Sequence, residues 1–183
     1  MKYDASVRAL LQPGRAPALF QTGQEYGPAG LCAEFSRLAY RGFEHSPAIA
    51  AQLTGEIAIA GFSVVALLAQ AGTQVMVLQR QQTLVLVFRG TLVQQDNGRL
   101  DWTDLRTDAG FWQRGWQTQE AELRLAQVLL GEGDARVHAG FAKALDVIWP
   151  QLAAWVEQCR PEQIWLTGHS LGAALAILAA GGK

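Results

Sequence analysis

A serine flanked by glycines near the end of the chain is the strongest chemical signal in the sequence. Gly168-His169-Ser170-Leu171-Gly172 matches the pattern G-x-S-x-G. The apolar segment QIWLTG precedes it and the small-residue segment LGAALAILAA follows it, so we predict a strand, a sharp turn and a helix. Such a turn strains the serine backbone and exposes its hydroxyl, and glycines on either side avoid a collision. We therefore predict Ser170 to be a nucleophile; the alternative is a tight turn whose serine merely caps a helix.

A second segment would complete this chemistry. VFRGT, Val87 to Thr91, ends an apolar β-branched run. A turn after a strand can present a backbone N–H to an oxyanion, and Thr91 can add its hydroxyl; the N–H of Leu171 is the other predicted donor. One such donor is worth about 2.7–4 kcal/mol of transition-state stabilisation. His169 is predicted to be structural, since the side chain at that position of the turn points away from the nucleophile.

The elements that must position these residues alternate between helical and strand patterns, which predicts an α/β fold. Residues 1–29 are predicted to be an arm and 30–183 a single domain. Strands are predicted at TQVMVLQR, TLVLVFRG and QIWLTG. Helices are predicted over AGLCAEFSRLAYRGF, SPAIAAQL with Ser46 as N-cap, residues 56–70, residues 118–130, HAGFAKALDVIWPQLAAWVEQC kinked or divided at Pro150, and LGAALAILAA closed by Gly181.

Composition excludes several classes of function. The 183 residues carry a net charge of −1 with scattered Arg and Lys, which is no footprint for nucleic acid. Cys32 and Cys159 fit neither a zinc motif nor a disulfide framework and are interpreted as buried small hydrophobes. No metal or cofactor is implied. The N-terminus lacks a secretory signal pattern and no apolar run is long enough to span a bilayer. A cytoplasmic protein is the default expectation, with export by a route without a signal left open.

Four motifs in order, VFRGT, DWTDL, VHAGF and LTGHSLGAALA, resemble the class 3 lipases, the fungal-lipase-like branch of the α/β-hydrolases. AEFSRLAYRGF resembles the early helix of that family, and the likeness covers roughly residues 30–183. It implies a three-layer αβα fold and a serine ester hydrolase acting on lipid acyl esters, with Ser170 as nucleophile and Thr91 and Leu171 as oxyanion-hole residues.

The resemblance also implies supporting roles. Asp101-Trp102 and His138 would support the site rather than carry protons. The segment from about 110 to 136 stands where these lipases carry a lid; its aromatic residues could equally be core. Those aromatic residues are Phe111, Trp112 and Trp116.

One departure from the family pattern is large. The triad of this fold runs serine, then acid, then histidine along the chain, yet the thirteen residues after Ser170 contain neither. We therefore expect an incomplete fold whose last strands are missing, with the triad Asp and His supplied by another segment. His138 is the one candidate for a substitute base. Without a base, the chain alone is expected to be nearly inactive, because losing the serine–histidine pair costs on the order of 10⁶-fold.

These expectations define the partners and the competing functions. An apolar strand left at a sheet edge invites pairing with another chain, so we expect a homodimer or a second polypeptide that completes the sheet and the triad. The substrate would be a lipid or ester, with transient contact to a lipid surface. The alternative is an inactive lipase-like remnant that binds acyl chains or a protein partner; a serine peptidase or acyltransferase on the same scaffold is a third option.

Overall fold

The computed structural model describes residues 17–90 and 139–181. The chain divides into two compact units, residues 1–92 with 144–183 and residues 93–143. Of the second unit only residues 139–143, the start of one helix, are described. The helices of the described part are α2 (Pro28–Leu38), the 3₁₀ turn η2 (Ala39–Arg41), α3 (Pro47–Ile59), α6 (Ala139–Cys159) and α7 (Leu171–Ala180).

A four-stranded sheet forms the centre of the first unit, in the order β1-β2-β3-β4. Its strands are β1 (Ser63–Gln70), β2 (Thr73–Arg80), β3 (Thr83–Phe88) and β4 (Gln163–Gly168). The first three form an antiparallel meander, and β4 joins β3 in parallel, from Thr83 beside Gln163 to Phe88 beside Gly168. Residues 84–88 of β3 are buried throughout, as its two-sided apolar pattern predicts for an interior strand.

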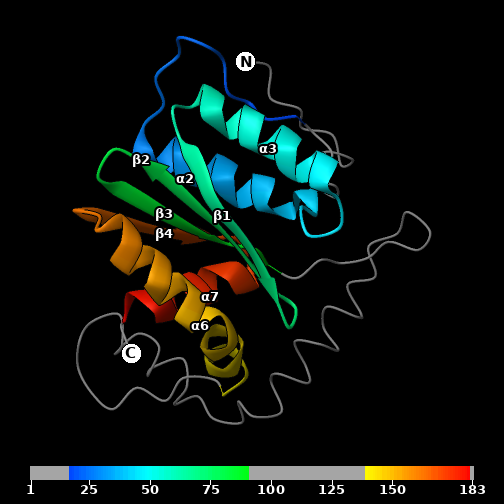
Figure 1. The fold of residues 1–183 in the computed structure, drawn as a ribbon, viewed down its shortest axis with the longest axis vertical. Coiled ribbons are helices and arrows are strands. Elements are labelled where there is room, and N and C mark those ends of the chain that lie inside the picture. Colours follow the sequence, from blue (N-terminus) through cyan, green and yellow to red (C-terminus); the bar gives the residue numbers. More distant parts are fainter. Residues whose placement is uncertain (1–16, 91–138, 182–183) are drawn as a thin grey trace. The chain divides into compact units, whose positions relative to one another are not determined.

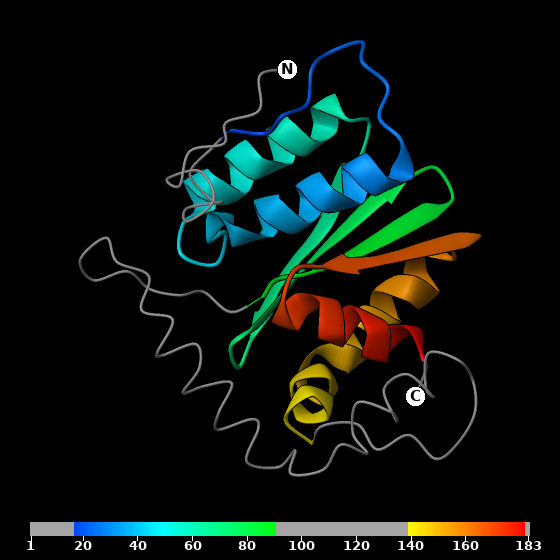
Figure 2. The same ribbon diagram turned by 180° about the vertical axis from the view of Figure 1, so that it is seen from behind.

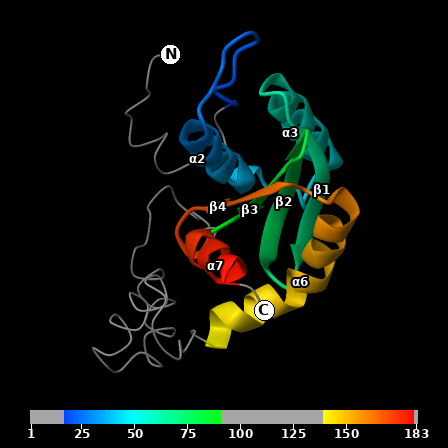
Figure 3. The same ribbon diagram turned by 90° about the vertical axis from the view of Figure 1, so that its left-hand side faces the viewer.

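Helices cover both faces of this sheet (Figures 1 and 3). Helices α2 and α3 pack on one face, and α7 and the part of α6 from Ala144 onward lie on the other. On the α2 side the core gathers aromatic and aliphatic side chains around Phe35 and Phe62, with Trp165 of β4 packed against them. On the opposite side, Leu145 and Leu152 of α6 and Leu175 of α7 are buried. The mixed α/β class predicted from the sequence is confirmed.

The starts of the helices follow local rules. Ser46 caps α3, its hydroxyl accepting a hydrogen bond from the Ile49 N–H at 3.4 Å, and Pro47 is the first helical residue. The N-cap role of Ser46 was predicted. Helix α6 is continuous through Pro150, so the helix is not divided there. The other predicted outcome was a kink, and the first and second parts of α6 do run in different directions (Figure 3). Proline removes the hydrogen bond to the Asp146 carbonyl, but both residues are exposed and water can take its place.

The predicted helix over residues 56–70 is the clearest error. Helix α3 ends at Ile59, the chain turns at Gly61 with φ of +78°, and Ser63–Gln70 is strand β1. The apolar residues of this segment show no alternation that would mark a strand, and pairing with β2 along its length decides the conformation instead. The predicted helix over residues 118–130 and the arm residues 1–16 lie outside the described residues.

The cysteines are less buried than predicted: Cys32 and Cys159 are both half-buried free thiols. None of the helices in the described segments combines the length and the apolar character needed to cross a bilayer. Within these same segments, histidine, cysteine and acidic side chains nowhere gather into a group that could hold a metal ion.

Candidate functional site

A sharp bend joins β4 to α7 (Figure 2), and Ser170 is the residue between the two elements. Its backbone has φ of 55° and ψ of −124°, a region that side-chain-bearing residues enter at a cost of about 1–3 kcal/mol. The side chain makes no capping hydrogen bond to α7, and the residue is exposed. Instead the backbone closes the bend: the Gly172 N–H donates to the His169 carbonyl and the Ala173 N–H to the Ser170 carbonyl, both at 3.0 Å. The bend therefore presents the hydroxyl to solvent.

The two glycines of the motif allow three segments of backbone to touch. A Cβ on Gly168 would lie 2.4 Å from the backbone of Gly172, and a Cβ on Gly172 would lie 2.2 Å from the Phe88 carbonyl oxygen. The clash that the sequence predicts is thus between a side chain and backbone. Because neither glycine carries a Cβ, α7 can begin in direct contact with the end of β3.

The end of β3 lies beside the bend as well. Parallel pairing sets Phe88 next to Gly168, and a Cβ on Gly90 would lie 2.4 Å from the His169 carbonyl oxygen. The predicted oxyanion residue Thr91 lies outside the described residues, but its neighbour Gly90 is at the site. Among the described residues, the N–H of Leu171 has no hydrogen-bond acceptor, so this first amide of α7 is available as a donor.

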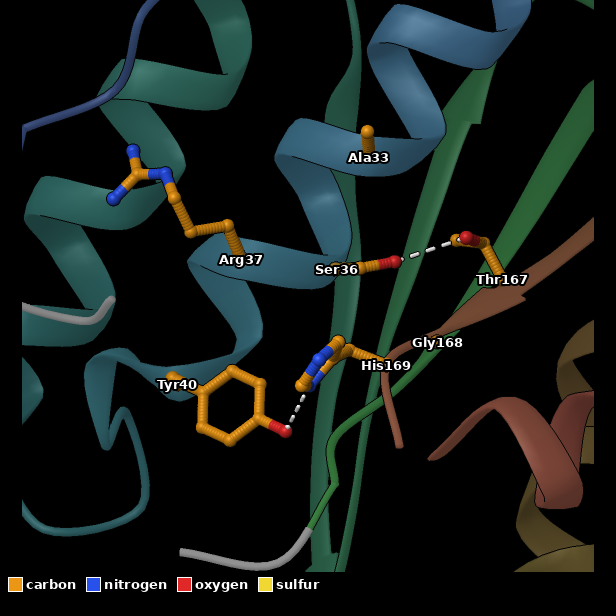
Figure 4. A pocket seen from close by; sticks show the side chains of 7 residues that line it. All are labelled: Ala33, Ser36, Arg37, Tyr40, Thr167, Gly168 and His169. Carbon is orange, nitrogen blue, oxygen red and sulfur yellow. Dashed lines mark hydrogen bonds between the residues drawn. The ribbon is translucent and has the colours of Figure 1, made fainter. Parts of the chain in front are cut away.

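Tyr40, a residue that sequence reasoning missed, is in contact with both strand ends. Its hydroxyl lies 2.9 Å from Nδ1 of His169, and the two rings meet edge to face with centroids 5.9 Å apart (Figure 4). A Cβ on Gly90 would lie 2.3 Å from the same hydroxyl. The only signal for it was the segment LAYRGF, within the likeness to the family's early helix. The His169 ring is thereby held by Tyr40 of η2; its structural role stays a prediction.

The surroundings of Tyr40 determine its protonation. Burial raises the pKa of Tyr40 above its ordinary value, and the nearby Arg89 charge and a hydrogen bond from the Gly90 backbone partly oppose this rise. A hydrogen bond that lowers a phenol pKa is one that its oxygen accepts, which fits the Gly90 N–H as the donor. The phenol stays protonated at neutral pH and keeps its own proton for donation.

Arg89 is anchored by a buried ion pair. It is only 7% exposed, and its guanidinium contacts the Glu44 carboxylate, which also lies 3.4 Å from Nε2 of His45. One oxygen of Glu44 and Nε of Arg89 are buried without a hydrogen-bond partner in the described part of the chain. The pair ties the end of β3 to the loop between η2 and α3.

A pocket of about 340 Å³ opens between α2 and the end of β4 (Figure 4). Its lining consists of Ala33, Ser36, Arg37, Tyr40, Thr167, Gly168 and His169. The hydroxyls of Ser36 and Thr167 are hydrogen-bonded at 2.9 Å, and Arg37 pairs with Glu34 at 2.6 Å. Ser170 does not line this pocket. The hollow therefore adjoins the bend on the α2 side and is separate from the exposed serine hydroxyl.

Comparison with known proteins is informative at the level of the family. Residues 85–181, more than half of the chain, match the model described as lipase (class 3). Searches of curated proteins and of solved structures each return no match. The matched segment runs from β3 through α7 and so contains both strand ends and the bend at Ser170. The family implies an α/β-hydrolase fold and confirms the resemblance drawn from the four motifs: the chain belongs to the class 3 lipase family.

Proposed function

We propose that the protein is a serine ester hydrolase that acts on lipid acyl esters, with Ser170 as its nucleophile. The observation that carries the proposal is the backbone of Ser170, strained at φ of 55° and ψ of −124°, with an exposed side chain that caps nothing. A folded chain retains strain of this kind where it serves a site. Ser170 Oγ attacks the ester carbonyl, the alcohol leaves, and water then hydrolyses the acyl-enzyme.

Two donors would stabilise the tetrahedral intermediate. The N–H of Leu171 stands at the start of α7, has no acceptor among the described residues, and lies at the positive end of the helix dipole. Thr91 follows Gly90, which packs against the His169 carbonyl. We propose that Thr91 supplies the second donor through its backbone N–H and its hydroxyl.

The general base must lie outside the described residues. Of the two histidines in that part, His169 is hydrogen-bonded to Tyr40 and His45 stands beside Glu44. We propose that the histidine and its acid come from a further segment, such as a second polypeptide or a second copy of this chain; His138 is the alternative base. Activation of the serine by such a pair is what makes it nucleophilic.

That further segment would lie along β4. Among the described strands β4 has one neighbour, β3, and its residues are half-buried or exposed where those of β3 are almost all buried. Ile164 of β4 is 44% exposed and Ile177 of α7 is also exposed. An apolar strand with an open edge pairs readily with another strand, and we propose that the added strand completes both the sheet and the triad.

A fluorophosphonate probe tests the nucleophile. We expect phosphonylation at Ser170, mapped by peptide mass spectrometry, in the chain together with the segment that supplies its base. Ser170→Ala should abolish labelling, whereas Ser63→Ala, a change at another exposed serine, should leave it intact. If Ser170 stays unlabelled when the base is present, the hydrolase proposal fails. An inactive remnant would instead bind acyl chains or a protein with an affinity that survives Ser170→Ala.

A further inference from the structure

Two strand ends that carry the proposed chemistry meet at one hydroxyl group. The Tyr40 hydroxyl lies against Gly90, since a Cβ on Gly90 would lie 2.3 Å from its oxygen, and the same oxygen is hydrogen-bonded to Nδ1 of His169 at 2.9 Å. A hydrogen bond with the Gly90 backbone also lowers the pKa of Tyr40. A phenol that accepts from the Gly90 N–H and donates to Nδ1 leaves the His169 proton on Nε2. Tyr40 would then link the end of β3 to the bend at the end of β4.

Gly90, Tyr40 and His169 lie in close contact with one another. A single added carbon on Gly90 would lie 2.3 Å from the Tyr40 hydroxyl and 2.4 Å from the His169 carbonyl oxygen. Gly90 immediately precedes Thr91, and His169 immediately precedes Ser170. Any change in the separation of Gly90 and His169 therefore moves the proposed oxyanion donor relative to the proposed nucleophile. A displacement of about 1 Å at such a site can cost on the order of 10²-fold in rate.

The chain segment that carries Tyr40 is itself anchored. Tyr40 belongs to η2, directly after α2, and its neighbours Leu38 and Ala39 are fully buried. Arg89, which pairs with Glu44, lies close enough to influence it. A hydroxyl next to buried residues has a well-defined position, which is what a positioning group requires.

We propose that Tyr40 is a positioning residue that couples the backbone of Gly90 to the imidazole of His169 and thereby sets the distance between the end of β3 at Gly90 and the bend that carries Ser170. This inference rests on the proposed function for its catalytic meaning. The coupling itself is a property of the folded chain and can be tested without catalysis.

The test compares Tyr40→Phe with Tyr26→Phe. Phenylalanine keeps the ring that packs against His169 and removes only the hydroxyl. Tyr26 is a matched control, because its hydroxyl also accepts from a backbone N–H, that of Gln21, and donates to a carbonyl, that of Leu19, but in the segment before α2. Both variants lose one tyrosine hydroxyl with two hydrogen bonds.

Long-range ¹⁵N–¹H NMR of the His169 ring and amide exchange at Gly90 provide the readout. We expect a single Nε2–H tautomer of His169 in the wild type, and a mixture of tautomers in Tyr40→Phe with Gly90 exchange faster by about tenfold, the effect of one lost hydrogen bond. Tyr26→Phe should match the wild type in both. An unchanged tautomer and unchanged exchange in Tyr40→Phe would overturn the proposal.

Phosphonylation of Ser170 in the same three proteins separates this inference from the proposed function. If wild-type Ser170 is labelled, we expect labelling of Tyr40→Phe to be about tenfold slower, as loss of one positioning hydrogen bond would give, and equal rates would refute positioning. If wild-type Ser170 is never labelled with its base present, the proposed function fails, while the NMR result still decides whether Tyr40 couples the two strand ends.

Discussion

Ser170 shows how one residue can carry a conformational cost for the sake of a site. Its backbone is strained at φ of 55°, and its side chain makes no capping hydrogen bond that would offset this strain. Neighbouring contacts stabilise the bend instead: the N–H groups of Gly172 and Ala173 donate to the carbonyls of the bend, and the backbone at Gly168 packs closely against it. At this scale stability and the proposed reactivity oppose each other.

A pair of substitutions measures that opposition. The free energy of unfolding of Ser170→Gly should be about 1 kcal/mol higher than that of Ser170→Ala. Glycine relieves about 1–3 kcal/mol of strain in the folded state, but it also raises the entropy of the unfolded chain, which cancels part of this gain. Alanine keeps the strained conformation and is the control for loss of the hydroxyl. Urea unfolding followed by circular dichroism gives both values. Equal stabilities would mean that the backbone at residue 170 is relaxed.

Cys32 gives a prediction on pH dependence. Burial raises its thiol pKa above the ordinary 9.0, with a smaller opposing effect of a hydrogen bond from Thr167. The folded chain thus holds this proton to higher pH than the unfolded chain, so the stabilisation is fully present below pH 9.0 and is lost as pH rises through the elevated pKa. We expect the free energy of unfolding to fall less steeply above pH 9.0 in Cys32→Ala than in the wild type. Parallel curves from urea titrations would contradict this.

The same residues show what a sequence reveals about a site. The motif around Ser170 is contiguous, so its strand, bend and helix could be predicted from local pattern. Tyr40 could not, because its partners Gly90 and His169 lie far along the chain and a lone tyrosine at the end of a helix has many roles. Contacts of that kind follow from the pairing of β3 with β4, which residue spacing does not encode.

At the scale of elements, the site depends on how closely α7 approaches β3. The first turn of α7 touches the Phe88 carbonyl through Gly172, a contact that brings the helix N-terminus to the strand end. A helix of small residues permits this approach over its length: α7 reads LGAALAILAA. The contact between Gly172 and the Phe88 carbonyl therefore serves both the packing of α7 and the geometry of the proposed oxyanion site.

Two alanine substitutions in the region of α7 should differ sharply. Gly172→Ala places a Cβ 2.2 Å from a backbone oxygen, whereas Gly181→Ala meets its nearest atom at 3.5 Å and has φ of −68°. We expect the first to lower the free energy of unfolding by about 3 kcal/mol or to prevent folding. The second should raise that free energy by up to about 1 kcal/mol, since alanine restricts the unfolded chain. Thermal and urea unfolding of both variants would refute this if Gly172→Ala proved neutral.

The elements differ in how far the sequence could predict them. The start of α3 at Ser46 and Pro47 could be predicted, because a helix cap depends on neighbouring residues in the sequence. Residues 63–70 were assigned to the wrong class because a run of Val, Ala and Leu suits a buried helix or a buried strand alike; only pairing with β2 distinguishes the two. Pro150 does not divide α6, because its position on the exposed side of the helix makes the loss of one hydrogen bond tolerable.

For the whole molecule, the edge of β4 that no other described strand pairs with predicts association. We expect the chain to form dimers or larger species at micromolar concentration through β4. Ile164→Lys should shift it toward monomer by placing a charge on that edge. Ile59→Lys is the matched control, because Ile59 is equally exposed, at 44%, but ends α3. Analytical ultracentrifugation of the three proteins would refute edge pairing if both variants behaved alike.

The parallel pairing of β3 and β4 also governs the order in which the molecule assembles. The meander β1-β2-β3 joins neighbours through two-residue turns and can form as soon as this stretch of chain is free. Thr83 meets Gln163 only after two residues far apart in the sequence have come together, and this costs entropy before any contact forms. The bend at Ser170 follows β4 directly, so it can take up its conformation beside the end of β3 only after this parallel pairing has formed, and the site is therefore built later than the meander.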